Sequence, residues 1–138
     1  MILLDTSGLL AALDGSQSQH REAAASLAEA RPPLLLSPFV LAELDYLIAS
    51  RVGPTARASL LEEVERGAYL IETMNGADVA RAHAIIQRYA DLQISLADAS
   101  IVVLAERRRV HDVLSLDERH FRVLTNRGKS FRLLPADA

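Results

Sequence analysis

Met1-Ile2-Leu3-Leu4-Asp5-Thr6-Ser7 opens the chain, and in it three apolar residues lead directly into an acid and two hydroxyl residues. A short and continuous apolar run is typical of a strand buried on both faces, as in a parallel sheet. Asp5 would then lie at the carboxyl end of that strand, the edge where open α/β sheets bind ligands. Aspartate is also a favoured N-cap, so this stretch alone leaves a helix cap and a functional site equally open.

Similar apolar runs recur along the chain, and amphipathic or alanine-rich segments separate them. We expect further strands at residues 34–36, 69–71, 113–115 and 131–134. We expect helices at residues 7–13, 18–31, 38–52, 55–66, 75–89 and 96–108, several of which follow a Ser or Asn cap. Strands that alternate with helices from end to end predict a parallel sheet covered on both faces. The predicted fold class is therefore α/β, a three-layer α/β/α sandwich with a central, mostly parallel sheet of about five strands. We expect it to form a single domain over residues 1–138.

Composition limits the chemistry and the location of the protein. The chain has no cysteine, which excludes disulfides, zinc–thiolate sites and thiol catalysis. No charge-free run approaches the roughly 20 residues that a membrane span needs. The apolar N-terminal run lacks the basic residues that precede it in a signal peptide. We therefore expect a cytoplasmic protein that makes no contact with a membrane.

The motifs of several common α/β enzymes are absent. The chain contains no Gly-x-x-x-x-Gly-Lys-Ser/Thr, no Gly-x-Gly-x-x-Gly and no Gly-x-Ser-x-Gly, which argues against two nucleotide-binding folds and a serine hydrolase. The histidines form no i,i+4 pair, so a histidine-based metal site is not predicted. We expect them mostly at the surface: His20, His83, His111 and His120.

Four acids fall where the predicted strands end or the next helices begin. Asp5 and Asp117 follow strands, and Asp98 lies in the first turn of a helix. Glu43 lies in the second turn of another helix, among apolar neighbours where an unpaired carboxylate is costly. In a parallel sheet these positions share one edge, so the four carboxylates are expected to converge. A capping role remains the alternative for Asp98, which fits a capping box with Ser95, and for Asp117.

Converging carboxylates have a restricted chemistry. Two of them about 4 Å apart repel by about 4 kcal/mol at an effective dielectric of 20. A group of four therefore takes up protons or binds cations, and oxygen ligands favour Mg²⁺ or Mn²⁺. In phosphoryl chemistry these ions activate water and neutralise charge on the leaving oxygen.

At these residues the sequence resembles the PIN-domain ribonucleases, specifically the VapC-type toxins of bacterial toxin–antitoxin modules. The matching segments occur in family order: Ile2-Leu3-Leu4-Asp5-Thr6-Ser7, Leu41-Ala42-Glu43-Leu44, Ser95-Leu96-Ala97-Asp98-Ala99 with Leu104-Ala105-Glu106, and Leu114-Ser115-Leu116-Asp117-Glu118-Arg119-His120-Phe121. The resemblance implies a metal-dependent endoribonuclease in which metal-activated water attacks the phosphodiester. The implied catalytic ligands of Mg²⁺ or Mn²⁺ are Asp5, Glu43, Asp98 and Asp117. The hydroxyls implied to support them are Thr6, Ser7 and Ser115, the last at a position where the family often has Thr.

The resemblance also implies partners, namely a structured RNA of the tRNA or rRNA class, an inhibitory cognate antitoxin and a second copy of the chain in a homodimer. Residues 101–134 carry a net charge of +4, whereas residues 1–100 carry −6, and this basic quarter suits a polyanion. The candidates for RNA contact are Arg107, Arg108, Arg109, Arg119 and Arg122, and further candidates for phosphate contact in this quarter are Arg127, Lys129 and Arg132. Two alternatives stay open: a non-catalytic RNA- or protein-binding module of the same fold, and a haloacid-dehalogenase-like phosphatase. Ser7 argues against the phosphatase alternative, because phosphatases of that class have a second Asp at this position.

Overall fold

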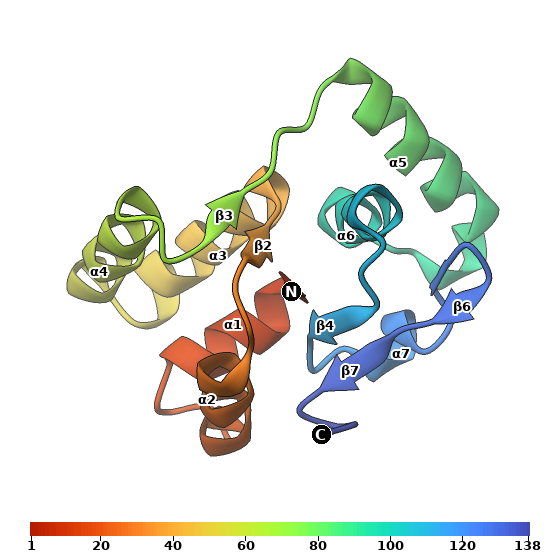
Figure 1. Cartoon of the computed structure of the whole chain (residues 1–138). Helices are drawn as coiled ribbons and strands as arrows, with labels where there is room; N and C mark the ends of the chain where they lie inside the picture. The colour runs from red at the N-terminus through yellow and green to blue at the C-terminus, as the bar shows by residue number, and fades with distance from the viewer.

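Five parallel strands form the central sheet of the computed structural model, which describes residues 1–138 (Figure 1). Their spatial order is β3-β2-β1-β4-β7, and every pairing is parallel. The strands are β1 (Ile2–Leu4), β2 (Leu34–Leu36), β3 (Leu70–Ile71), β4 (Asp112–Leu114) and β7 (Arg132–Leu134). The N-terminal strand therefore lies in the middle of the sheet. The predicted α/β class and parallel sheet are confirmed.

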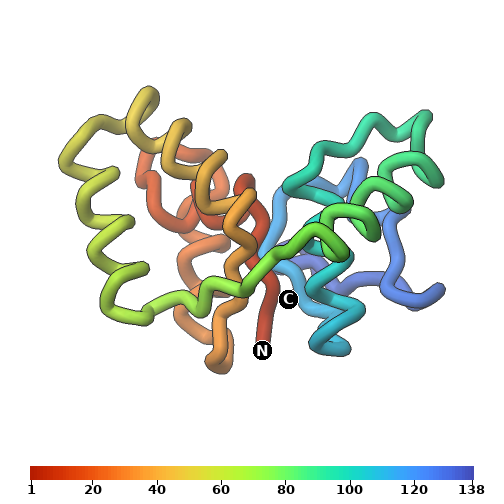
Figure 2. Tube along the Cα trace, turned by 90° about the horizontal axis from the view of Figure 1, so that it is seen from above, coloured from red at the N-terminus to blue at the C-terminus, as the bar shows by residue number.

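Seven helices flank the sheet, with a short 3-10 turn between two of them. They are α1 (Thr6–Leu13), α2 (His20–Glu29), α3 (Pro38–Arg51), α4 (Pro54–Glu65), α5 (Gly76–Arg88), η1 (Ala90–Leu92), α6 (Leu96–Arg108) and α7 (Glu118–Phe121). Figure 2 shows α1 to α4 on one side of the central strands and α5 to α7 on the other. Local sequence sets several starts: the Ser37 side chain accepts a hydrogen bond from the Phe39 amide, and Asn75 forms a capping box with Asp78.

The apolar runs are buried as a parallel sheet requires. The residues of β1 are at most 2% exposed, and Leu35 and Leu36 of β2 are fully buried. The middle of α6 packs against the sheet through residues such as Ile101 and Leu104. The third strand is an exception, because β3 is a two-residue edge strand whose side chains are both exposed.

The sequence did not predict the antiparallel hairpin of β5 (Thr125–Asn126) and β6 (Lys129–Ser130). Its turn residues Arg127 and Gly128 both have positive φ, at 51° and 81°. Two-residue hairpin turns of this kind favour Asn or Gly, and an arginine at the first position conceals the signal. The Asn126 amide donates to the carbonyls of Ala105 and Val110 and so attaches the hairpin to the end of α6.

No helix combines the length and the apolar composition that crossing a membrane requires.

Candidate functional site

All four predicted acids line one cleft, with a volume of about 390 Å³, at the carboxyl edge of the sheet. Asp5 follows β1, and Asp117 lies after β4 as the N-cap of α7. Asp98 lies in the first turn of α6, and Glu43 comes from α3. Strand ends and helix starts meet at one edge because the sheet is parallel. The same edge therefore collects acids that are up to 112 positions apart in the sequence.

Asp5 is the most buried of these acids, with an exposed fraction of 4%. Its Oδ2 atom accepts hydrogen bonds from Ser115 Oγ at 2.7 Å and from Ser7 Oγ at 2.8 Å. Burial raises the pKa of the Asp5 carboxyl from 3.8 to about 6, and the two hydroxyls offset part of that rise. The negative charges of Asp98 and Asp117 add to the rise. The site therefore holds a carboxylate whose charge is poorly compensated by the protein.

Close packing between α1 and β4 brings the two serines to Asp5. A Cβ atom added to Gly8 would lie 2.3 Å from the backbone oxygen of Leu114, so only glycine fits here. Ser7 Oγ also accepts a hydrogen bond from the Leu116 amide, at 3.0 Å. The predicted support by Ser7 and Ser115 thus has a structural basis in direct contacts with Asp5.

Thr6, the other hydroxyl expected to support the acids, makes no such contact. Its Oγ1 atom is buried and has no hydrogen-bond partner. Thr6 nevertheless borders the cleft as the first residue of α1.

Asp98, Asp117 and His120 form the tightest group of potential ligands, with one ligand atom of each within 4.8 Å of the others. His120 Nδ1 lies 2.7 Å from Asp117 Oδ2 and 3.6 Å from Asp98 Oδ2. A carboxylate only accepts, so Nδ1 carries the proton in the shorter contact. Asp5 and Glu43 line the same cleft but lie outside this group.

The expectation that His120 is a surface residue was wrong. Its side chain is 19% exposed and faces two of the acids. The sequence contained a signal for this, because Asp117 and His120 are three residues apart and such pairs meet on one helical face. The sequence analysis predicted a capping role as the alternative for Asp117, but no contact between Asp117 and the His120 imidazole. Asp117 does accept the His120 amide at 3.1 Å, so it both caps α7 and binds the imidazole.

Glu43 does not lie in the apolar environment that the sequence suggested. Its side chain is exposed, whereas Leu44 and Ile48 on the same helix are buried in the core. The helical face that carries Glu43 also presents Leu47 and Arg51 to the cleft. The expected cost of burying Glu43 does not arise, although Glu43 lies in the cleft beside the other acids as predicted.

Arg51 was missed at the sequence level. It is exposed at the end of α3, lines the cleft and has no carboxylate within ion-pair distance. Its spacing of eight residues from Glu43 could have indicated a shared helical face. Arg51 is the one Lys or Arg side chain that borders the cleft.

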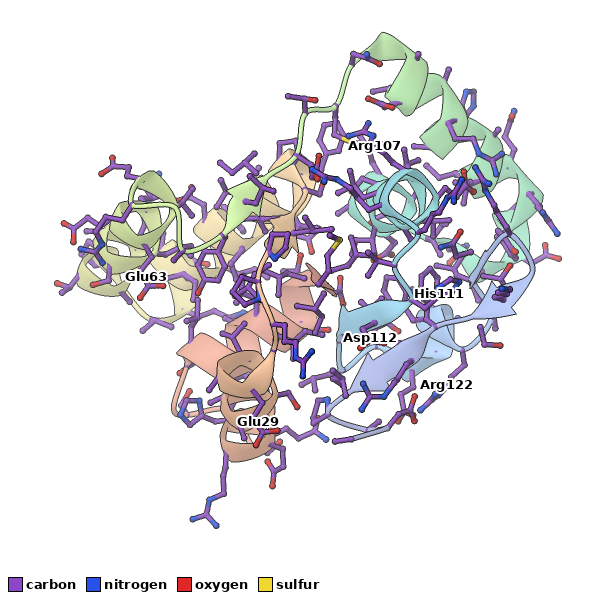
Figure 3. All side chains as sticks on the ribbon, viewed as in Figure 1. Glu29, Glu63, Arg107, His111, Asp112 and Arg122 are labelled. Atoms are coloured by element: carbon purple, nitrogen blue, oxygen red, sulfur yellow. The ribbon has the colours of Figure 1, made fainter.

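Two of the predicted RNA-contact arginines are held by acids of the protein. Arg107 lies between the end of α6 and the segment after β3, where it pairs with Glu72 at 3.4 Å and Asp78 at 2.8 Å (Figure 3). Arg108 pairs with the other oxygen of Glu72. Glu72 is only 6% exposed, so these arginines compensate a buried charge.

Arg122, also labelled in Figure 3, forms bidentate contacts with Asp137 and pairs with Glu118. The guanidinium lowers the pKa of Asp137 to about 2. Of the five predicted RNA-contact residues, Arg109 and Arg119 alone have no carboxylate partner. The other three have a structural role that explains their charge.

The donor set of the cleft fits a divalent cation. It contains carboxylate oxygens and one imidazole nitrogen, which suit Mg²⁺ or Mn²⁺ and tend toward Mn²⁺ if the imidazole takes part. Both serines donate to Asp5 Oδ2, and no hydrogen bond from the protein reaches Asp5 Oδ1. A cation would supply the compensation that the buried Asp5 charge lacks.

Comparison with known proteins adds independent information. The model of the PIN domain family matches residues 2–125. Ribonuclease VapC26 of Mycobacterium tuberculosis (strain ATCC 25618 / H37Rv) is 38% identical over 135 residues, which cover 97% of this chain and 100% of that protein. The crystal structure of M. tuberculosis VapC20, described as a sarcin-ricin loop cleaving toxin, superposes with a TM-score of 0.82 at 19% identity over 91% of this chain and 98% of that one. FitAcB from Neisseria gonorrhoeae gives a TM-score of 0.55 at 25% identity over 82% and 85% of the two chains.

Proposed function

This chain belongs to the PIN-domain family, and on that premise we propose that it is a metal-dependent endoribonuclease, the toxin of a toxin–antitoxin pair. The observation that carries the proposal is the convergence of four acids on one cleft, in a chain that is 38% identical to a ribonuclease. A non-catalytic module would be marked by the loss of one or two of these acids, and all four are present in the cleft. A phosphatase of the haloacid dehalogenase type is not favoured, because Ser7 in place of its second Asp is hydrogen-bonded to Asp5.

The proposed cofactor is Mg²⁺ or Mn²⁺, which the acidic side chains of the cleft would hold. The proposed ligands are Asp5, Glu43, Asp98 and Asp117. A divalent cation in such a site supplies a water of lowered pKa and neutralises charge that develops on the phosphate. In the hydrolysis, a bond forms between the oxygen of water and phosphorus, the bond from phosphorus to the 3′ oxygen breaks, and that oxygen takes up a proton.

The residues of this chain prepare the site for that reaction. Ser7 and Ser115 fix one oxygen of Asp5 and leave the other free. His120 fixes Asp117 through its Nδ1 proton. Arg51 faces the acids from the wall formed by α3 and is proposed to bind the substrate phosphate beside the cleaved bond.

The proposed substrate is a structured RNA of the tRNA or rRNA class, and the proposed inhibitor is a cognate antitoxin that covers the cleft. We further propose a homodimer that acts in the cytoplasm. The RNA substrate is supported by the 38% identity to Ribonuclease VapC26, and the antitoxin by that identity together with the likeness in fold to FitAcB. Mapping RNA ends after induced expression in a bacterial host would identify the substrate and the cleaved bond.

The proposal is tested by incubating the purified full chain with total RNA in Mn²⁺ or in a chelator. The same assay is run on Asp5→Asn and Asp98→Asn, with Asp91→Asn as the matched control. Asp91 is an exposed acid of η1 that does not line the cleft. We expect cleavage by the wild type and the control in Mn²⁺, and none in chelator or with the two cleft variants. Cleavage that persists in chelator and in both cleft variants would refute the proposed function.

A further inference from the structure

Most of the positive charge of the chain is either paired or dispersed, with one exception. Of the 15 Lys and Arg residues, six lie within ion-pair distance of a carboxylate: Arg57, Arg81, Arg107, Arg108, Arg122 and Arg132. Four of the other nine surround one groove: Arg88, Arg109, Arg127 and Lys129. These four cations thus lie around one groove, and none of them has a carboxylate partner.

We call this the hairpin groove, because it lies between α5, α6 and the β5–β6 hairpin. It consists of two adjoining pockets of about 120 and 170 Å³ that share Glu106 and Arg127 as lining residues. Figure 1 shows the hairpin beside the C-terminal end of α5, and Figure 3 labels His111 at the other end of the groove, where α6 joins β4.

The groove carries positive charge that the protein itself does not neutralise. Glu106 is the one acid in its lining, and both of its oxygens are taken by Arg81 in contacts of 2.7 and 3.1 Å. Arg88 stacks over the ring of Tyr89 at 5.4 Å, which adds an aromatic surface beside the cations. Cations combined with an aromatic face are typical of grooves that follow a single-stranded nucleic acid.

The backbone of the groove holds arginines where glycine would be easier to accommodate. Arg109 ends α6 with φ at 56°, and Arg127 lies in the hairpin turn with φ at 51°. Side chains other than Gly and Asn are disfavoured in this left-handed region. Gln93 is the third such residue, and it borders the acidic cleft. Every non-glycine residue with positive φ therefore presents a long polar side chain to the cleft or the groove, which points to a use for those side chains.

The hairpin groove is close to the acidic cleft along the chain. Tyr89 lines the groove and Gln93 lines the cleft, and only the short turn η1 separates them. Four residues span at most about 15 Å. A nucleic acid strand bound across the cleft can thus reach the Tyr89 end of the groove.

We propose that the hairpin groove binds the phosphate backbone of the RNA on one side of the cleaved bond. This inference rests on the proposed function and adds a second anchoring site to it. An acidic protein would also be attracted, but the centre of a protein interface is typically apolar. None of the exposed large apolar residues of the chain lines the groove. The apolar side chains of Ile85 and Val102 that line the groove are buried, and the exposed side chains of its lining are Arg and Lys, which favours RNA.

Binding of a fluorescently labelled single-stranded RNA, measured by anisotropy over a range of salt concentrations, tests the inference. The test variant is Arg127→Gln/Lys129→Gln, and the matched control is Arg21→Gln/Arg66→Gln. The control removes two exposed and unpaired arginines at α2 and at the end of α4. Circular dichroism establishes that both proteins are folded. A chelator is present throughout, so the result depends neither on cleavage nor on metal.

Each phosphate contact in single-stranded binding contributes about 0.7 to the slope of log K against log salt. The groove variant should therefore show a slope smaller by about 1.4, with weaker binding at low salt, and the control should retain the wild-type slope. If the groove variant binds RNA with the wild-type slope, the inference is overturned. The same result is expected if the groove binds an acidic protein and not RNA. Failure of the wild type to bind RNA at low salt would also overturn it. Since cleavage is not measured, these outcomes are distinct from a failure of the nuclease assay.

Discussion

Replacing the buried acid at the end of β1 should stabilise the metal-free protein, but only above the pKa of that acid. Burial raises the pKa of Asp5 from 3.8 to about 6. The folded state therefore holds a proton that the unfolded state has released between these values, and stability falls as pH rises through this window. A difference of about two pKa units corresponds to about 3 kcal/mol in the free energy of unfolding. This contribution is fully lost above pH 6. In Asp5→Asn, the amide oxygen can still accept from Ser7 and Ser115 without the cost of a buried charge.

Urea unfolding in the presence of a chelator measures this effect. The Asn variant should exceed the wild type in free energy of unfolding by about 1–3 kcal/mol near pH 8. The part of the difference that is due to charge should disappear near pH 4. The lower figure allows for the cost of burying an amide N–H₂ group without a partner. Saturating Mn²⁺ should make the wild type more stable than Asp5→Asn, because only the wild type would bind the ion. A variant that is less stable than the wild type at pH 8, or a difference independent of pH, would refute the reasoning.

Three further substitutions test the supports of the cleft. Ser115→Ala removes a hydrogen bond to the buried Asp5 and should lower the free energy of unfolding at neutral pH by about 2 kcal/mol, measured in urea. Gly8→Ala forces a backbone clash and should cost about 1–3 kcal/mol, whereas Gly76→Ala, with open space around it, should be neutral in the same assay. Arg51→Gln should raise KM for RNA several-fold with a smaller change in kcat; a loss confined to kcat would contradict a role in binding phosphate.

The parts of the fold that depend on local sequence were predictable. The apolar runs identified the strands, because burial on both faces of a parallel sheet demands such runs. Caps identified helix starts: Ser95 and Asp98 form the capping box that the sequence suggested. In the sequence analysis, helix capping and a role in the acidic site were alternatives for Asp98, but the two roles are compatible. Asp98 Oδ2 accepts the Ser95 amide, and no hydrogen bond from the protein reaches Oδ1.

What the sequence left undetermined depends on contacts between distant residues. Arg107 meets Glu72 from 35 positions away, so its charge looked available for RNA. Glu43 seemed buried because its sequence neighbours are apolar, yet a helix exposes one face regardless of neighbours on the others. The sequence thus identified the charged residues themselves, but not the ion pair of Arg107 or the exposure of Glu43.

The central claim is that the acids of the cleft hold the divalent cation on which cleavage depends. Calorimetric titration of Mn²⁺ into the wild type and into Asp98→Asn, alongside RNA cleavage measured over the same Mn²⁺ range, tests it most directly. We predict saturable binding to the wild type, with a half-saturation concentration that matches half-maximal cleavage, and loss of both in the variant. Cleavage at Mn²⁺ concentrations where no ion binds, or wild-type Mn²⁺ affinity in Asp98→Asn, would contradict the claim.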